Sequence, residues 1–395
     1  MHLFIHALGA SAGGGLTYLR NVVRHFAEHP EVRVSFLASR NSLSLLPVSE
    51  NIHPVEHDTD AMGTLSRFLW EQRHVPELVK RTGADVLLCT GNFAVWKSPV
   101  PQILLSRNSL YTSADFARDL RRRGEYRLLA DTRLKGYVAR KSIARAELVV
   151  APSLAFAREL KNWAQRDVTA LHHGFDRDEF FRDPTPLPPA ILEKLGSDPN
   201  TVRLLFVSHY NYYRNFETLL RGLALLKRQD SKRRIQLVLT CELVPGRNPG
   251  SYRTDRATGL LRELQIAGDV VQLGSVSYPQ LHHVYRACQI YVTPAYTETF
   301  AHPLVEAMAC GLPIVASDIE VHREITVGGA IFFERFSAED LASKVSKLAE
   351  SPLLQAEVRE KGMSRCAAFS WKAHVDKLIE FARSLADGRA NADPR

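Results

Sequence analysis

The segment Cys288–Asp318, CQIYVTPAYTETFAHPLVEAMACGLPIVASD, decides the fold. Residues 289–294 are a short run of β-branched and aromatic residues, and residues 313–317 (PIVAS) form a second such run. Between the two runs, the pattern predicts a helix that begins at Pro303 and ends at Gly311, because proline suits the first helical turn and glycine suits the position just past the end. The segment is therefore predicted to form a strand, a loop, a helix and a second strand.

Two glutamates occupy particular places in this predicted unit. Glu298 is expected in the loop at the carboxyl end of the first strand, and Glu306 is expected in the first turn of the helix. In open α/β sheets, ligands bind in the crevice at the carboxyl ends of the strands. Both carboxylates are therefore candidate ligand-binding groups, although a glutamate in a first helical turn is more often a surface residue that complements the helix dipole.

Strand-like runs, such as HLFIHAL at residues 2–8, alternate with helical patterns along both halves of the chain. This alternation predicts an α/β fold in which helices cover both faces of parallel sheets. Four prolines between residues 184 and 189 predict a linker between two domains. We expect two Rossmann-like domains, residues 1–183 and 190–369, and a C-terminal helix at residues 370–388 that packs back on the first domain.

The length and composition suit two such domains, since the chain has 395 residues, of which 45% are hydrophobic. The net charge of +8 is concentrated in residues 118–145, a segment that contains ten Lys or Arg residues and only three acidic residues. This basic segment has two interpretations, either a solvated helical face or a surface that holds an anionic, membrane-linked acceptor. Nucleic acid is disfavoured as a partner, because no motif of stacking aromatic residues accompanies the charge.

The five cysteines are widely spaced, and none forms a Cys-x-x-Cys pair. We therefore expect reduced core cysteines in a cytoplasmic protein. Residues 1–15 lack the basic region and the long apolar run of a signal peptide, and no stretch approaches the roughly 20 apolar residues of a membrane-spanning helix. The basic segment leaves open a peripheral position on the inner face of the membrane.

Residues 298–318, ETFAHPLVEAMACGLPIVASD, resemble the signature of retaining glycosyltransferases of the GT-B fold. This large group includes sucrose synthases, bacterial mannosyltransferases and lipopolysaccharide glucosyltransferases. The match consists of two glutamates with seven residues between them, followed by Ala-Met-Ala, Gly-x-Pro and a strand-like run. Four other segments agree with the resemblance: GGG at 13–15, HHGFDRDEF at 172–180, SHYNYYRNFETLL at 208–220 and GSVSYPQL at 274–281.

The resemblance covers about residues 1–385 and implies an α/β fold of two Rossmann-like domains that face a central cleft. The first domain would bind the acceptor and the second the nucleotide sugar. The implied enzyme is a hexosyltransferase that moves a sugar from a nucleoside diphosphate sugar to an acceptor hydroxyl with retention of configuration. The expected acceptor is a glycan or a lipid-linked molecule in the synthesis of a bacterial-type cell-surface polysaccharide or glycolipid.

A nucleotide-sugar donor offers ribose hydroxyls, a diphosphate and sugar hydroxyls, so its site needs carboxylates together with cations or amide groups. The resemblance assigns Glu306 to the ribose hydroxyls and Glu298 to the donor sugar. The N–H groups of Thr299, Phe300 and Ala301, at a helix N-terminus, suit a phosphate. The other donor-binding residues that it implies are Gly13, Gly14, Gly15, His209, Arg214, Val276 and Leu304. An ordinary strand-to-helix turn is the alternative interpretation of the glycine triplet.

Arg214 falls where the family carries the cation that neutralises the leaving diphosphate, and a solvated arginine beside a helix start is the alternative. Five residues earlier, where a second arginine is usual, this chain has His209, which is only partly charged near neutral pH. Arg107 stands where the family often has a histidine, and an arginine there would face the diphosphate or an anionic acceptor. The predicted catalytic residues are therefore Glu298, Arg214 and Arg107.

The sequence predicts no metal site and no cofactor beyond the nucleotide sugar as co-substrate. Its histidine pairs, at 172–173 and 282–283, are adjacent rather than spaced as metal ligands usually are. Two other functions stay open on the same fold. One is a nucleotide-sugar epimerase or hydrolase, and the other is a catalytically idle module that tethers a membrane or a partner through the basic segment.

Overall fold

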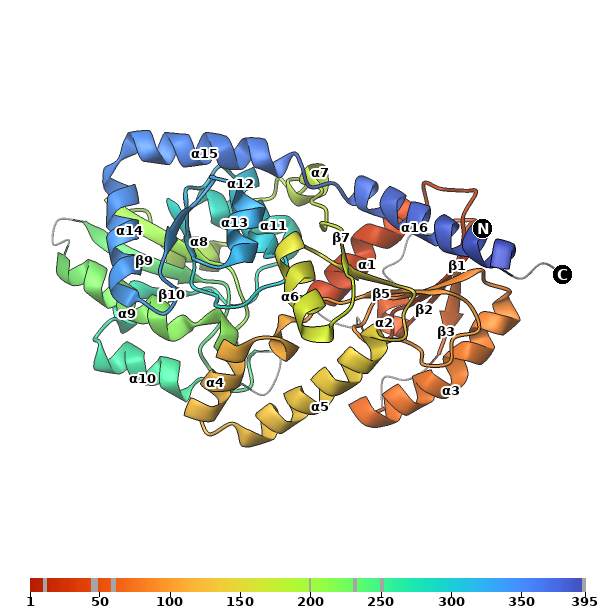
Figure 1. The fold of residues 1–395 in the computed structure, drawn as a ribbon. Coiled ribbons are helices and arrows are strands. Elements are labelled where there is room, and N and C mark those ends of the chain that lie inside the picture. Colours follow the sequence, from red (N-terminus) through yellow and green to blue (C-terminus); the bar gives the residue numbers. More distant parts are fainter. Residues whose placement is uncertain are drawn as a thin grey trace. The chain divides into compact units, whose positions relative to one another are not determined.

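Residues 1–9, 13–43, 49–57, 62–198, 200–229, 233–248 and 252–392 are described by the structure, which is a computed structural model (Figure 1). The strands form two sheets, and each pair of neighbouring strands is parallel. The first sheet has the order β3-β2-β1-β4-β5-β6-β7, and the second has the order β10-β9-β8-β11-β12-β13. The predicted α/β fold with two parallel sheets is confirmed.

The chain divides into two compact units, which are described here separately. The first unit comprises Met1–Thr112, Gly124–Gly174 and Ser370–Arg395, and the second comprises Ser113–Arg123 and Phe175–Phe369. The short segment Ser113–Arg123 thus belongs to the second unit, although the chain on either side of it belongs to the first.

The first unit contains the seven-stranded sheet. Its strands are β1 (His2–His6), β2 (Arg33–Ala38), β3 (Ile52–Glu56), β4 (Val86–Cys89), β5 (Gln102–Leu105), β6 (Leu148–Ala151) and β7 (Thr169–Ala170). Its helices are α1 (Gly13–Phe26), α2 (Arg40–Leu43), α3 (Thr64–Thr82), α5 (Tyr126–Ile143), α6 (Leu154–Ala164) and α16 (Trp371–Ala392), with a 3-10 turn at Ser109–Tyr111.

The second unit contains the six-stranded sheet. Its strands are β8 (Thr201–Phe206), β9 (Arg234–Leu239), β10 (Val270–Gln272), β11 (Ile290–Thr293), β12 (Ile314–Ser317) and β13 (Ile331–Phe333). Its helices are α4 (Ala114–Arg122), α7 (Arg177–Phe180), α8 (Pro189–Leu195), α9 (Phe216–Gln229), α10 (Asp255–Glu263), α11 (Tyr278–Arg286), α12 (His302–Ala309), α13 (Glu320–Thr326), α14 (Ala338–Glu350) and α15 (Pro352–Cys366), with 3-10 turns at Tyr212–Arg214 and Ala267–Asp269.

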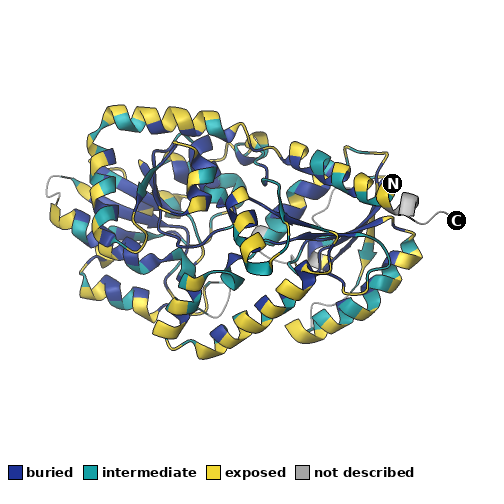
Figure 2. Cartoon of the chain, in the orientation of Figure 1, coloured by how far each residue is buried: buried dark blue, intermediate teal, exposed yellow. Residues whose placement is uncertain are grey.

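The inner strands of each sheet are buried on both faces, as Figure 2 shows, whereas the edge strand β3 is mostly exposed. In β1, Leu3 and Ile5 point into the cluster that contains the apolar residues of α1 and α16, whereas Phe4 points into the cluster that contains Val75 and Val79 of α3. This alternation is the two-residue period of a strand. Burial on both faces explains why inner strands such as β4, β11 and β12 are near-continuous apolar runs rather than alternating ones.

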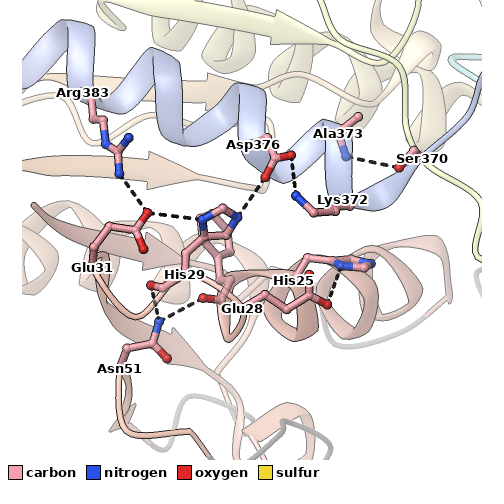
Figure 3. A network of polar contacts seen from close by, with 11 residues as sticks. His25, Glu28, His29, Glu31, Asn51, Ser370, Lys372, Ala373, Asp376 and Arg383 are labelled. Atoms are coloured by element: carbon pink, nitrogen blue, oxygen red, sulfur yellow. Dashed lines mark hydrogen bonds and ion pairs between the residues drawn. The ribbon is translucent and has the colours of Figure 1, made fainter.

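The last helix, α16, packs on α1 of the first unit. Its buried residues recur at helical spacing on one face: Trp371, Val375, Leu378, Ile379 and Ala382. The Ser370 hydroxyl accepts a hydrogen bond of 3.2 Å from the N–H of Ala373 and so caps the helix. Two polar pairs border this contact (Figure 3): His29 is hydrogen-bonded to Asp376 at 2.9 Å, and Glu31 forms an ion pair with Arg383 at 2.9 Å. Because these pairs are partly exposed, apolar burial dominates the packing.

No helix within the described ranges is long and apolar enough to cross a lipid bilayer.

Candidate active site

The segment that decides the fold forms β11, a loop and α12. The helix α12 begins at His302, one residue before the predicted Pro303. Ala301 turns the chain into the helix with left-handed backbone angles (φ 64°, ψ 62°), and Gly311 follows the helix with φ 67°. Glycine adopts such a conformation without strain, whereas alanine does so at a cost, so the backbone is constrained where the loop meets the helix.

Glu306 lies in the second turn of α12 rather than in the predicted first turn, because the helix begins earlier than expected and its first turn contains no acidic residue. Its side chain is buried, and the hydroxyl of Tyr285 in α11 donates a hydrogen bond of 2.8 Å to its Oε2 atom. Burial raises the pKa of Glu306 to about 7, although the hydrogen bond from Tyr285 favours the charged form. This carboxyl group is therefore poised to gain or lose its proton near neutral pH.

Arg214 and Glu298 form an ion pair between Nη1 and Oε1. Arg214 ends the 3-10 turn that follows β8, and Glu298 lies in the loop that follows β11. Their side chains are only 17% and 8% exposed. Two of the predicted catalytic residues, 84 positions apart in the sequence, are thus in direct contact, and this geometry does not fit the alternative of a solvated Arg214.

The place of this ion pair in the sheet is informative. The strands β8 and β11 are hydrogen-bonded neighbours, yet the chain runs from β8 outward through β9 and β10 before it returns to β11. Such a reversal of strand order opens a crevice at the carboxyl ends of the strands, which is where ligands bind in open α/β sheets. Arg214 and Glu298 follow the two strands that flank this point.

His209, three residues beyond β8, is exposed. Partial desolvation and the nearby charge of Arg214 lower the pKa of His209 below its ordinary value of 6.5. At pH 7 the imidazole is therefore mainly neutral. His209 can serve this site as a hydrogen-bonding group, but it does not supply a second full positive charge.

The remaining predicted donor-binding residues of the second unit contribute in different ways. Phe300 and Leu304 are buried, and the Phe300 ring packs edge-on against Phe369 at 5.3 Å between centroids, so these side chains belong to the core. Thr299 and Val276 are half-buried in the loops that precede α12 and α11.

Two predicted features lie in the first unit. Gly13, Gly14 and Gly15 are the first three residues of α1, so the triplet forms the first turn of this helix. Arg107 follows β5; its Nη2 donates to the carbonyl of Thr90 at 2.7 Å, and its guanidinium lies 4.4 Å from the centroid of the Tyr18 ring. Burial lowers the pKa of Arg107.

Sequence reasoning missed a buried charged pair at the carboxyl end of β1. His6 lies 3.6 Å from Glu71 of α3, and both side chains are 8% exposed. Burial lowers the pKa of His6, but the charge of Glu71, together with interactions with Glu71 and Cys89, outweighs this effect, and the pKa rises to about 10. His6 is therefore a buried cation at neutral pH. No local signal marks the pair, because its members are 65 residues apart in sequence.

No group of three or more His, Cys, Asp or Glu side chains in the described part of the chain is arranged to hold a metal ion.

Two family models together match most of the chain. The model described as glycosyl transferases group 1 matches residues 189–365, and the model described as glycosyltransferase family 4 matches residues 12–179. The chain belongs to the group 1 glycosyltransferases of the GT-B fold. The two matched ranges correspond closely to the halves of the chain on either side of the proline cluster, and the sequence signature at residues 298–318 falls within the first of these models.

Curated relatives of this glycosyltransferase carry one recurring name. D-inositol 3-phosphate glycosyltransferase from Nocardiopsis dassonvillei is 26% identical over 257 residues, which are 63% of this chain and 58% of the relative. D-inositol 3-phosphate glycosyltransferase 2 from Catenulispora acidiphila is 29% identical over 226 residues, 56% of this chain and 52% of the relative. The chain thus spans about half the length of the curated relatives it matches.

Solved structures share the fold over nearly the whole length. Sucrose-phosphate synthase from Thermosynechococcus elongatus superposes with a TM-score of 0.78 at 19% identity, covering 98% of this chain and 99% of that one. Anabaena HepE in complex with UDP-glucose superposes with a TM-score of 0.68 at 17% identity, covering 97% and 99%. At these identities the likeness establishes the fold of this glycosyltransferase and nothing beyond it.

Proposed function

We propose that this glycosyltransferase moves a sugar from a nucleoside diphosphate donor to an acceptor hydroxyl, and that the donor binds at the carboxyl ends of β8 and β11. The observation that carries the proposal is the buried ion pair between Arg214 and Glu298 at the reversal of strand order. Burying two charges is expensive, and apolar side chains of similar volume often stabilise a fold equally well. A ligand that carries both anionic and hydroxyl groups explains their presence.

Each charged group of the site has a proposed partner on the donor. Arg214 would neutralise the diphosphate as the glycosyl phosphate bond breaks, and its Nε atom is buried with no hydrogen-bond partner among the described residues. Glu298 would then be released to accept hydrogen bonds from the sugar hydroxyls. Glu306 would accept both ribose hydroxyls, which requires its charged form. The N-terminus of α12 would face the phosphates.

UDP is the first nucleotide to test, because Anabaena HepE has been solved with UDP-glucose. Thermal unfolding should be followed with UDP, GDP, ADP, dTDP and their sugars, since a ligand that binds the native state raises the midpoint by mass action. We expect one nucleotide series to stabilise the protein, and Glu306→Gln to remove that effect. Glu357→Gln, at an exposed residue of α15 paired with Lys361, is the matched control and should retain it.

Stabilisation by none of these ligands would contradict the proposed donor site. Stabilisation that survives both Glu306→Gln and Arg214→Ala would place the nucleotide elsewhere. Turnover of the bound donor without an acceptor product would favour a hydrolase, and isomerisation of its sugar would favour an epimerase.

The finer chemistry belongs to the same proposal. We base three further properties on the resemblance of residues 298–318: retention of configuration, a hexosyl donor and independence from metal. Proton NMR of the product tests the configuration and the sugar. Activity in excess chelator tests the independence from metal. The acceptor is proposed to be a glycan or lipid-linked hydroxyl compound used for a cell-surface polysaccharide. The names of the curated relatives add a phosphorylated cyclitol to the compounds worth testing.

The basic segment at residues 118–145 supports a second, separate proposal, that the protein works in the cytoplasm on the surface of an anionic membrane. Arg123 does not contribute to such a surface, because its side chain is only 9% exposed and pairs with Asp119 and Glu217. The relevant element is α5, which exposes three large apolar side chains, Tyr126, Leu134 and Tyr137. Exposed basic residues lie among them: Arg127, Arg133, Arg140 and Lys141.

A helix on the surface of a domain usually buries its large apolar side chains, so the exposure of Tyr126, Leu134 and Tyr137 needs an explanation. Arg133, Leu134, Tyr137 and Lys141 are spaced so that they share one face of α5. Figure 2 shows the exposed side of this helix as a nearly continuous stripe. Apolar insertion combined with basic side chains is what binds a helix in the plane of an anionic membrane.

A further inference from the structure

The helix α4 (Ala114–Arg122) is a separate structural insertion into the second unit. The chain leaves the first unit after Thr112 and re-enters it at Gly124, so only the eleven residues 113–123 belong to the second unit here. The helix has clear ends: the Ser113 hydroxyl accepts a hydrogen bond from the N–H of Phe116, and Gly124 follows with φ 69°. Phe116 and Leu120 are buried.

One side chain of α4 binds the loop that carries Glu298. Asp119 accepts a hydrogen bond of 3.0 Å from the hydroxyl of Tyr296, which is buried two residues before Glu298. The N–H of Tyr296 in turn donates to the carbonyl of Tyr213 at 3.1 Å, and Tyr213 immediately precedes Arg214. Tyr296 therefore ties α4, the loop after β11 and the turn after β8 together.

The residue that follows α4, Arg123, contacts the turn that carries Arg214. The guanidinium of Arg123 lies 4.3 Å from the centroid of the Tyr212 ring, and Tyr212 begins the 3-10 turn that Arg214 ends. Arg123 also pairs with Glu217 at the start of α9 at 2.5 Å, and with Asp119 at 2.9 Å. Since the side chains of Arg123, Asp119 and Glu217 are all under 20% exposed, the three charges depend on one another for compensation.

The contacts thus run from α4 and the residue after it to the two segments that carry Glu298 and Arg214. We propose that Asp119 and Arg123 are positioning residues of the donor site: through Tyr296 and Tyr212 they fix the spacing of Glu298 and Arg214. This inference rests on the proposed function, since it assumes that these two residues bind the donor. Neither Asp119 nor Arg123 would touch the donor, so their effect on it is transmitted through the loop and the turn that they hold.

The physical reason is preorganisation. The loop after β11 and the turn after β8 contain left-handed residues at Ala301 and Asn215, so their backbones are held by surrounding contacts rather than by local preference. A site whose charged groups are held in the binding geometry avoids the entropic cost of ordering them when the ligand arrives. Loosening either contact of α4 should therefore weaken donor binding more than it weakens the fold.

The test uses the whole 395-residue chain, with UDP as the probe. If another nucleotide stabilises the protein more than UDP does, that nucleotide is tested as well. Tyr296→Phe removes only the hydroxyl that binds Asp119, and Asp119→Asn removes only the charge. We expect each change to raise the dissociation constant measured by calorimetry about tenfold. The combined effect of the two changes should be smaller than the sum of the single effects, because both act on the same contact.

Asp269→Asn is the matched control, since Asp269 is paired with Lys227 and its side chain is 16% exposed against 17% for Asp119. The control should bind UDP as the wild type does. A purely structural role for Asp119 would lower the unfolding temperature of Asp119→Asn and Tyr296→Phe while the folded protein keeps its affinity, and that result would overturn the inference. If Glu306→Gln abolishes binding but Asp119→Asn and Tyr296→Phe bind UDP as tightly as the wild type, the donor site stands and the positioning role falls. If no nucleotide binds the wild type, both fall.

Discussion

Glu306 shows at the level of one residue how burial prepares a carboxylate for a ligand. Its pKa of about 7, against an ordinary value of 4.5, means that folding penalises the charged form. The shift is equivalent to about 3 kcal/mol, and the hydrogen bond from Tyr285 already offsets part of the cost of burial. A ligand that brings two hydroxyl donors would compensate the buried charge further.

This penalty predicts how stability changes with pH. The folded pKa of Glu306 lies above the unfolded value, so the native state holds its proton between about pH 4.5 and pH 7 while the unfolded chain has lost it. The contribution of Glu306 to stability is therefore fully present below pH 4.5 and is lost as the pH rises to about 7. Unfolding temperatures of the wild type and Glu306→Gln, compared from pH 4.5 to 8, should show the wild type falling progressively relative to the variant.

Glu357→Gln controls for the general effect of removing a carboxylate. The hydrogen bond and the charge of Lys361 lower the pKa of this exposed carboxyl, so its small contribution to stability is present above pH 4.5 and is lost only as the pH falls below that value. A constant difference between the wild type and Glu306→Gln across the whole range would show that Glu306 is not shifted in the native state.

At the level of elements, the segment HHGFDRDEF at residues 172–180 has a structural explanation. A Cβ atom on Gly174 would lie 2.0 Å from the backbone nitrogen of Trp371, where α16 begins, so only glycine fits. Asp176 caps α7 by accepting a hydrogen bond from the N–H of Glu179, and Phe180 is buried. Gly174 therefore permits close packing, Asp176 caps a helix, and Phe180 fills the core.

Gly174→Ala is therefore expected to displace the first turn of α16. The clash is with backbone atoms of Trp371 and Ser370, which cannot rotate away as a side chain can, so the cost should reach or exceed about 3 kcal/mol. Differential scanning calorimetry should show a clear loss of unfolding temperature. Gly259→Ala, in the interior of α10 with no atom within 4 Å of the added Cβ, should instead gain roughly 0.5–1 kcal/mol. Equal effects of the two changes would contradict this account.

What the sequence predicts is mostly local. The strand and helix of residues 288–318 follow from periodicity, proline and glycine, and Ser370 caps the last helix as its side chain suggests. The contact of Tyr285 with Glu306, and that of Asp119 with Tyr296, depend on which elements pack together, and no period in the sequence encodes them. For the same reason the pattern of residues 113–123 gives no sign that α4 belongs to the second unit.

At the level of the whole molecule, the surplus of charge in residues 118–145 divides into two parts. In the first part, Arg123 at the end of α4 forms ion pairs with Asp119 and Glu217, whereas the basic residues of α5 are exposed beside apolar side chains. The basic patch of the sequence is therefore smaller than its count of charges indicates, but its exposed part has the composition of an interfacial helix.

If α5 binds an anionic membrane, the wild type should co-sediment with vesicles of phosphatidylcholine and phosphatidylglycerol at low salt. Each basic side chain near the anionic surface contributes about 1 kcal/mol to this binding. Because salt screens this attraction, binding should be weaker at high salt. When Arg133, Arg140 and Lys141 are changed together to Glu, this binding should be abolished, since the lipid charge would then repel α5.

The matched control changes three exposed arginines of the second unit to Glu: Arg221, Arg228 and Arg262. It alters the net charge equally and should leave binding largely intact. Leu134→Ser with Tyr137→Ser should weaken binding even at low salt, because the apolar contribution is lost while the charge is unchanged. Vesicle binding that is reduced equally by both charge reversals would mean that net charge alone attracts the protein and that α5 is a solvated face.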